Sequence, residues 1–112
     1  MCIFCDIIHK KIQANIILET TQLIVIQDQA PKAPTHLLIL PKKHISTLNE
    51  STLDDSDLLG NMILTAKKLA ADLGIDQSGY RLIFNVNPDG GQTVLHIHLH
   101  LLGGRQLTWP PG

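Results

Sequence analysis

The chain has 112 residues, 44% of them hydrophobic, and a formal net charge of −1, a composition typical of one small globular domain. This charge balance lacks the basic surplus of a nucleic-acid-binding domain. No apolar run approaches the ~20 residues of a membrane span, and no basic start followed by a long apolar stretch marks an export signal. We therefore expect a cytoplasmic protein that binds neither nucleic acid nor a membrane.

Two cysteines, Cys2 and Cys5, stand near the start of the chain. They are too few for the disulfide framework of an exported domain, and their Cys-x-x-Cys spacing fits a redox pair or half of a zinc site. Two histidines, His44 and His96, are available to complete a Cys2His2 tetrahedron around zinc. A pair of thiols that binds no metal is the alternative.

Hydrophobic patterning predicts five strands. Three of them, over residues 16–19, 23–28 and 37–40, lie in the first part of the chain. Two more are predicted over residues 80–86 and 95–102, joined by a glycine-rich turn. Strands arranged mostly as hairpins, together with one crossing helix, indicate an α+β fold with a mainly antiparallel sheet.

The crossing helix is predicted over residues 54–73. Thr52 or Ser51 can cap its start, acidic residues occupy its first turn, and Gly74 follows its end. Its apolar residues recur at three- and four-residue steps and form one face, which consists of Leu58, Leu59, Met62, Ile63, Ala66, Leu69, Ala70 and Leu73.

The most informative segment reads His96-Ile97-His98-Leu99-His100 and holds half of the six histidines in the chain. Histidine alternates here with aliphatic residues at the two-residue period of a strand. This period places the imidazoles on one face and the aliphatic residues, Leu95 and Leu101 included, on the other. Buried imidazoles need hydrogen-bond partners or a ligand. The segment therefore indicates a metal site or a phosphate site, and a strand that merely tolerates histidines is the structural alternative.

A turn sequence, Asn87-Pro88-Asp89-Gly90-Gly91-Gln92-Thr93, stands directly before these histidines. Paired glycines let backbone N–H groups approach an anion, and Thr93 adds a hydroxyl. Fixed donors and several imidazoles around one small volume suit a phosphate better than a bare metal. A metalloenzyme with three histidine ligands is disfavoured, because the strand would need strong twist to bring them to one ion.

Residues 90–105 resemble the signature of the histidine-triad (HIT) superfamily. Residues 2–8 resemble the N-terminal segment of that family and residues 33–45 its middle block. The Gly-Gly-Arg-Gln and Trp-Pro-Pro-Gly stretches near the end are similar to its Hint branch, the histidine-triad nucleotide-binding proteins. The resemblance implies a single HIT domain over residues 1–112, with a five-stranded sheet, one long helix and a short N-terminal helix. It also implies a homodimer, in which the extended tail, residues 103–112, contributes to the partner's site.

The resemblance further implies nucleotidyl transfer to a histidine, followed by hydrolysis. His98 corresponds to the nucleophile, and His100 and His36 would contact phosphate oxygens. Thr93 would place its hydroxyl near the scissile bond. Asp28 would accept hydrogen bonds from both hydroxyls of a ribose, although an aspartate there can also simply begin a turn. The other expected nucleotide contacts come from Phe4, Ile7, Ile26, Gln29, Asn85, Gly91, Gln92 and Trp109.

The predicted activity is hydrolysis of the P–N bond of purine nucleoside 5′-phosphoramidates, such as adenosine monophosphoramidate, or of aminoacyl-adenylate-type compounds, to AMP. Two alternatives stay open: a dinucleoside polyphosphate hydrolase and a nucleotide-binding sensor with little catalysis. The route through a histidine requires no cofactor. Zinc, which some bacterial members of the family bind, would therefore be structural here, held by Cys2, Cys5, His44 and His96.

Overall fold

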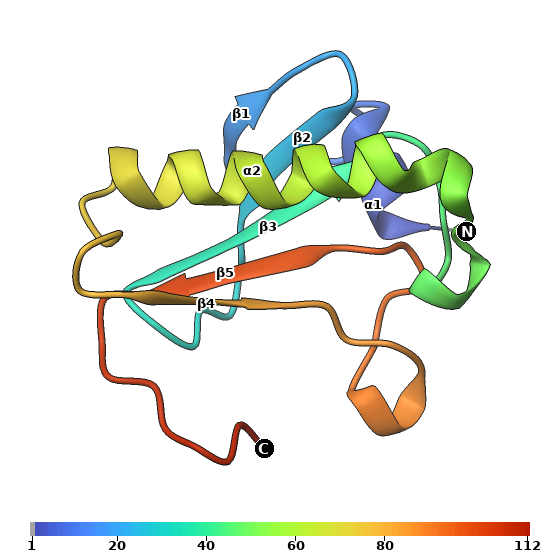
Figure 1. Cartoon of the computed structure of the whole chain (residues 1–112). Coiled ribbons are helices and arrows are strands. Elements are labelled where there is room, and N and C mark those ends of the chain that lie inside the picture. The colour runs from blue at the N-terminus through green and yellow to red at the C-terminus, as the bar shows by residue number, and fades with distance from the viewer. Residues whose placement is uncertain (1) are drawn as a thin grey trace.

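The structure, a computed structural model that describes residues 2–112, is a five-stranded sheet with one long helix on one face and one short helix on the other (Figure 1). The strand order is β1-β2-β3-β5-β4, and each neighbouring pair is antiparallel. The predicted α+β fold with its short N-terminal helix is confirmed. The helices are α1 (Ile3–Ile8) and α2 (Ser56–Asp72), and the strands are β1 (Ile16–Glu19), β2 (Leu23–Gln27), β3 (Thr35–Pro41), β4 (Tyr80–Ile83) and β5 (Leu99–Gly103).

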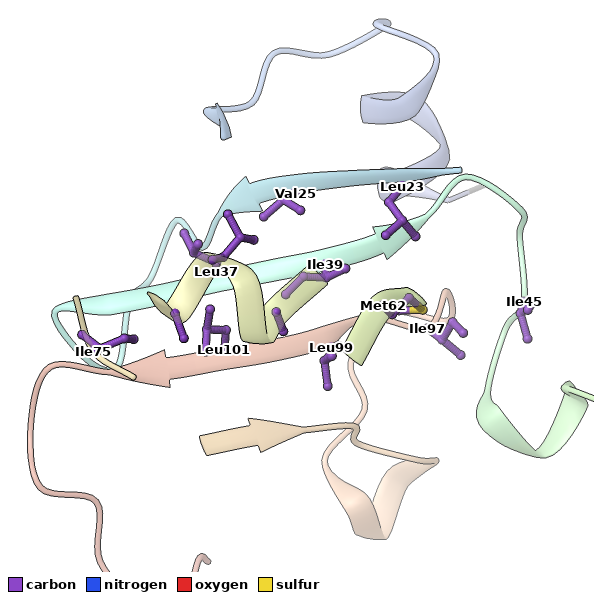
Figure 2. Packing of buried hydrophobic residues seen from close by; sticks show 13 residues of the cluster. Leu23, Val25, Leu37, Ile39, Ile45, Met62, Ile75, Ile97, Leu99 and Leu101 are labelled. Atoms are coloured by element: carbon purple, nitrogen blue, oxygen red, sulfur yellow. The ribbon is translucent and has the colours of Figure 1, made fainter. Parts of the chain in front are cut away.

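Alternate residues of the central strands β2 and β3 face two separate hydrophobic clusters. One cluster fills the space between the sheet and α2, where Val25 and Ile39 pack with Met62 (Figure 2). The other cluster joins Ile24 of β2 to Phe4 of α1 on the opposite face. Because both faces are covered, these strands are continuous apolar runs rather than alternating ones.

Helix α2 begins two residues later than predicted, because a turn of 3-10 helix, Leu53–Asp55, precedes it. Thr52 caps this turn. Its hydroxyl accepts a hydrogen bond from the Asp54 N–H at 3.2 Å, and the Asp55 carboxylate accepts one from the Thr52 N–H at 2.9 Å. Gly74 follows the helix with a φ of +73°, which glycine adopts without strain. The predicted stop is therefore confirmed, whereas the predicted cap, Thr52, serves the 3-10 turn, and α2 itself begins after Asp55 without a side-chain cap.

Strands β4 and β5 are shorter than predicted, because the chain leaves the sheet on both sides of the glycine-rich turn. The last paired residues there are Ile83 of β4 and His100 of β5, and Leu99 is the first residue of β5. Between the strands the chain turns through Asn87, whose φ is +61°, and the 3-10 turn Pro88–Gly90. Two of the three alternating histidines consequently lie just before the paired strand.

Beyond β5 the chain continues to residue 112 without a helix or strand (Figure 1). Consecutive prolines near its end donate no backbone hydrogen bonds, in keeping with the irregular tail that the sequence predicts. Over residues 2–112, none of the helices has the length and apolar character that crossing a membrane requires.

Candidate active site

The alternating histidines lie on the face of the sheet that α1 covers. His100 pairs with Leu38 of β3, whose side chain belongs to the cluster on the α1 side. The ring of Phe4 in α1 packs edge-on against His98, with the ring centroids 5.0 Å apart. The short N-terminal helix therefore forms one wall of the site.

The aliphatic residues of the same segment point the other way. Ile97, Leu99 and Leu101 are buried in the cluster beneath α2 (Figure 2). The predicted alternation thus holds from Ile97 onward. Leu95, expected on the same aliphatic face, instead has 60% of its surface exposed and lies in the bend over residues 94–96.

A backbone carbonyl fixes the orientation of the His98 ring. Nδ1 of His98 lies 2.8 Å from the backbone oxygen of His96, and because a carbonyl can only accept, Nδ1 carries the proton. Nε2 therefore keeps a free lone pair. Burial lowers the pKa of His98 below its usual value of 6.5, so the ring is neutral at neutral pH. A buried, neutral imidazole with one free nitrogen has the form of a nucleophile or a general base.

A chain of hydrogen bonds assigns the protons of the two neighbouring histidines. The backbone N–H of Lys32 donates to Nδ1 of His36 at 3.0 Å, so the His36 proton resides on Nε2. That nitrogen lies 2.9 Å from Nδ1 of His100 and donates to it. The proton of His100 therefore resides on its Nε2.

Nε2 of His100 is where this chain of hydrogen bonds ends. It is the one buried side-chain nitrogen or oxygen in residues 2–112 that has no hydrogen-bond partner. Burial, with His98 and His36 as further causes, lowers the pKa of His100 to about 4, so the ring stays neutral. An unpaired buried donor costs about 1–3 kcal/mol, and an anionic oxygen would satisfy it. The site thus contains a fixed neutral donor whose hydrogen bond is not yet made.

Asp28 directly follows β2 and makes two contacts. Its Oδ1 accepts a hydrogen bond from the Ala30 N–H at 2.8 Å, which is the turn-forming role that the sequence allows. Its Oδ2 lies 3.4 Å from Nε2 of His36. The turn contact fixes the carboxylate beside the histidines, on the wall of the same cavity as His98.

A cavity of about 550 Å³ opens between α1 and the histidines. It brings together many of the residues that the sequence predicts to bind a nucleotide, namely Phe4, Ile7, Ile26, Asp28, Gln29, Thr93, His98 and His100. Sequence reasoning missed other lining residues, which are Ile3, residues 12–15, Gln27, Leu38 and Val94. Residues 12–15 form the connection between α1 and β1 and carry no pattern that marks them. Val94, by contrast, lies between the turn and the histidines, and this position in the sequence could have identified it as a lining residue.

Gln92 and Gly91 lie in the loop before the histidines. The side-chain amide of Gln92 donates to the backbone oxygens of Ser46 at 2.7 Å and Val94 at 3.0 Å. Its side-chain oxygen accepts from the Asn87 N–H at 2.9 Å. Gly91 has a φ of +84°, which a residue with a side chain rarely adopts. Both residues shape the loop, and their predicted contact with a nucleotide stays a prediction.

Asn85 and Trp109 line a different cavity, of about 510 Å³, beside β4. The guanidinium of Arg81 donates to the backbone oxygen of Thr108 at 3.0 Å and fastens the tail to β4 of its own chain. Trp109 is 81% exposed. Within one chain these two residues are therefore not brought to the cavity of His98, and their role in nucleotide binding stays a prediction.

The four predicted metal ligands, Cys2, Cys5, His44 and His96, meet in one place, with their donor atoms all within 4.8 Å of one another. Sγ of Cys5 lies 3.3 Å from Nδ1 of His44, and Sγ of Cys2 lies 3.4 Å from Nδ1 of His96. The two Nδ1 atoms are 3.1 Å apart. A tetrahedron with Zn–S of ~2.3 Å and Zn–N of ~2.0–2.1 Å has S···N edges of about 3.5 Å and N···N edges of about 3.3 Å. The donor set therefore fits zinc.

His96 belongs to this cluster and not to the site of His98. Its Nε2 lies 2.8 Å from the backbone oxygen of Pro41 and donates to it, which leaves the lone pair of Nδ1 for a metal. His100 belongs to a second group, with Asp28 and His36. Across residues 2–112, no group of ligand side chains contains all three alternating histidines, so the hypothesis of a three-histidine metal centre gains no support.

Residues 9–107 match the model of the HIT domain family. The chain belongs to this family. A HIT family hydrolase from Legionella pneumophila is 56% identical to it, with a TM-score of 0.99 over 100% of both chains. A histidine triad nucleotide-binding protein from Candida albicans is 31% identical, with a TM-score of 0.83 over 98% of this chain and 83% of that one. A Zn-bound histidine triad family protein from Mycobacterium smegmatis is 28% identical, with a TM-score of 0.80 over 94% of this chain and 76% of that one.

The predicted HIT resemblance is thereby confirmed at the level of the family. His98 and His100 of this HIT domain line one cavity, and the fold is that of the HIT family hydrolase from Legionella pneumophila. Its cluster of cysteines and histidines is a candidate metal site.

Proposed function

We propose that this HIT protein hydrolyses purine nucleoside 5′-phosphoramidates to the nucleoside monophosphate, as expected of the Hint branch. One observation carries the proposal: of two adjacent neutral imidazoles, one can accept a proton or attack through a free lone pair and the other can donate a hydrogen bond. His98 offers a lone pair, His100 offers an N–H, and their ring centroids are 4.9 Å apart. A nucleophile beside a fixed donor suits a reaction at phosphorus, in which one ring attacks and the other holds an oxygen.

The reaction proceeds in two steps. First, Nε2 of His98 bonds to phosphorus, the P–N bond to the leaving amine breaks, and the amine takes up one proton. The ring, still protonated at Nδ1, becomes cationic, and the backbone oxygen of His96 stabilises it. Water then attacks phosphorus, the P–N bond to His98 breaks, and the nucleoside monophosphate leaves with one proton returned to the solvent. The two steps consume one water and restore the free enzyme.

The cavity also supports binding of a nucleotide in one orientation. Its apolar residues suit a purine ring, the carboxylate of Asp28 suits ribose hydroxyls, and the N–H of His100 suits a phosphate oxygen. His36 acts through His100, whose donor it orients. The remaining proposed contacts come from Gln29, Asn85, Gly91, Gln92, Thr93 and Trp109.

We further propose that Cys2, Cys5, His44 and His96 hold a structural zinc ion. When bound, the metal would cross-link α1 to the segment before β5 and contribute no step of the reaction. This cross-link matters to the site, because α1 carries Phe4, which packs against His98. His96 also supplies the carbonyl that orients His98.

A homodimer is the assembly that we propose for this domain. Within residues 2–112, the edge strand β4 has no partner on one side. On α2, the apolar residues Ile63 and Leu64 have 44% and 62% of their surface exposed. A second copy would cover such an edge and such apolar residues. The tail, residues 103–112, would then reach the site of the partner. A cytoplasmic location also remains our expectation.

Trapping the intermediate tests the proposed activity. After the protein is mixed with a slowly cleaved adenosine phosphoramidate, mass spectrometry should find AMP on the peptide that contains His98. His98→Ala should still bind AMP while its turnover falls by about three orders of magnitude or more. His9→Ala, at an exposed histidine outside the site, is the matched control.

The outcomes separate the three candidate functions. A label on another side chain, or undiminished turnover by His98→Ala, would exclude the proposed nucleophile. Faster cleavage of a dinucleoside polyphosphate than of the phosphoramidate would favour the polyphosphate hydrolase. AMP binding with no turnover of either substrate by the unaltered protein would favour the nucleotide sensor.

A further inference from the structure

Cys2 and Cys5 lie close enough to react with each other. Cys2 directly precedes α1 and Cys5 lies in its first turn, a three-residue spacing that makes side chains neighbours on a helix. The backbone N–H of Cys5 donates to Sγ of Cys2 at 3.3 Å, and the two sulfur atoms lie within 4.8 Å of each other. Both cysteines are free, and the sequence contains no other cysteine. A disulfide within one chain can therefore form only between these two residues.

Both cysteines border a cavity beside α1. The cavity has a volume of about 780 Å³, and its lining includes Cys2, Cys5 and His44 of the cysteine–histidine cluster. Each of the two cysteines is only half-buried. The other lining residues are uncharged, namely Ile3, Ser46, Thr93, Val94 and Leu95. A small uncharged oxidant such as hydrogen peroxide therefore has room to approach the sulfur atoms.

Metal binding and disulfide formation exclude each other at this pair of cysteines. The thiolate is the form of cysteine that binds zinc, and a sulfur atom in a disulfide is no longer a thiolate. Oxidation of both cysteines would leave His44 and His96 as the remaining ligands of the cluster. Two imidazoles are half of the four ligands that hold a structural zinc ion, so the oxidised protein would not retain the metal.

Phe4 connects this pair of cysteines to the cavity of His98. It stands between the two cysteines in the sequence, and its ring centroid lies 6.0 Å from that of His96 and 5.0 Å from that of His98. Ile7, one turn further along α1, lines the same cavity as His98. Once the sulfur atoms no longer hold α1 to the cluster, the helix is held by apolar packing of residues such as Phe4 and Ile7. This wall of the cavity is then less firmly fixed, and a ligand that contacts it binds less tightly.

We propose that Cys2 and Cys5 are an oxidative modification site: hydrogen peroxide converts them to a disulfide, the zinc ion is released, and the cavity of His98 binds AMP less tightly. This inference rests on the proposed zinc site and nucleotide binding, and it goes beyond the proposed hydrolysis. One sulfur attacks the peroxide and becomes a sulfenic acid, with loss of one water. The other sulfur attacks the sulfenic acid, the disulfide forms, and a second water leaves. The pair of cysteines loses two electrons, and the peroxide gains them with two protons from the thiols or the solvent.

Treatment of the zinc-loaded protein with hydrogen peroxide tests the inference. Three quantities are measured before and after treatment: the zinc released to a chromogenic chelator, the mass of the intact chain, and the Kd of AMP. We expect one zinc ion released per chain and a mass lower by two hydrogen atoms. The Kd of AMP should rise about fivefold or more, the lower end of typical coupling between two sites. Dithiothreitol with added zinc should reverse all three changes.

The double variant Cys2→Ser, Cys5→Ser is the matched control, because it cannot form the disulfide. Peroxide should leave its Kd of AMP unchanged. An equal rise of the Kd in the variant and in the unaltered protein would show that peroxide acts at another residue, and this result would overturn the inference.

The measurements on the unaltered protein decide the question whether or not the variant folds. A disulfide accompanied by zinc release and a higher Kd of AMP supports the inference. Two thiols that stay reduced, zinc that stays bound to the oxidised chain, or an unchanged Kd of AMP would each overturn it. A reduced protein that holds no zinc would overturn the proposed zinc site and this inference together. Hydrolysis of the phosphoramidate by the reduced protein is assayed separately, so failure of the proposed activity is distinguished from all of these results.

Discussion

The unpaired His100 makes the stability of the protein depend on pH in a definite direction. Burial lowers the pKa of His100 from 6.5 to about 4 in the folded protein. Between these values the unfolded chain binds a proton that the folded chain does not bind. The contribution of His100 to the free energy of unfolding is therefore fully present above about pH 6.5, and it is lost as the pH falls toward 4. By linkage, this residue alone removes about 2 kcal/mol of stability between about pH 7.5 and pH 5.

Urea unfolding of the unaltered protein and of His100→Asn at these two pH values measures that contribution. The variant lacks the titrating ring but retains the cysteine–histidine cluster, so pH effects on metal binding cancel in the comparison. We expect the unaltered protein to lose about 2 kcal/mol more than His100→Asn on acidification. Equal losses in the two proteins would refute the reasoning that His100 is held neutral by burial.

Two further substitutions test the metal cluster and the turn after β5. Cys5→Ser should reduce the zinc bound per chain, measured by atomic absorption, and should lower the thermal midpoint of the zinc-loaded protein; an unchanged zinc content would contradict the assigned ligands. Gly104→Ala should destabilise the protein by about 1–3 kcal/mol in urea, because Gly104 has a φ of +90° and an added Cβ would lie 2.9 Å from Cβ of Pro34. Gly112→Ala, with no atom within 4 Å of an added Cβ, is its control and should have no effect.

The elements that the sequence predicts well are those whose signal is local. The glycine stop of α2 depends on a few adjacent residues, and so does the Thr52 cap, which the structure places on the 3-10 turn directly before α2. The Cys-x-x-Cys pair is a local signal too, but its spacing fits a redox pair as well as half of a metal site, and the metal site also needs His44 and His96. What local patterns do not contain is the distance between segments remote in sequence. That Cys2 meets His96 follows only from the packing of α1 onto the sheet.

The predictions that failed concern where regular pairing stops. Alternating hydrophobicity extends from Leu95 to Leu101, but the paired strand begins at Leu99. Alternation at every second residue indicates which face of an extended chain each side chain occupies. The same alternation occurs in extended segments that pair with no neighbouring strand. The same limit applies to residues 12–15, which line the cavity of His98 although nothing in their sequence distinguishes them from an ordinary connection.

The three alternating histidines show how one repeat yields three different chemical groups. In each ring, a hydrogen bond at one nitrogen decides what the other nitrogen can do. His96 donates from Nε2 to Pro41, so its Nδ1 is free to bind a metal. His98 donates from Nδ1 to the oxygen of His96, so its Nε2 is free to attack. His100 accepts at Nδ1 from His36, so its Nε2 carries a proton that it can donate. Identical side chains at a two-residue spacing thus present a lone pair on Nδ1, a lone pair on Nε2 and an N–H on Nε2, because their hydrogen-bond partners differ.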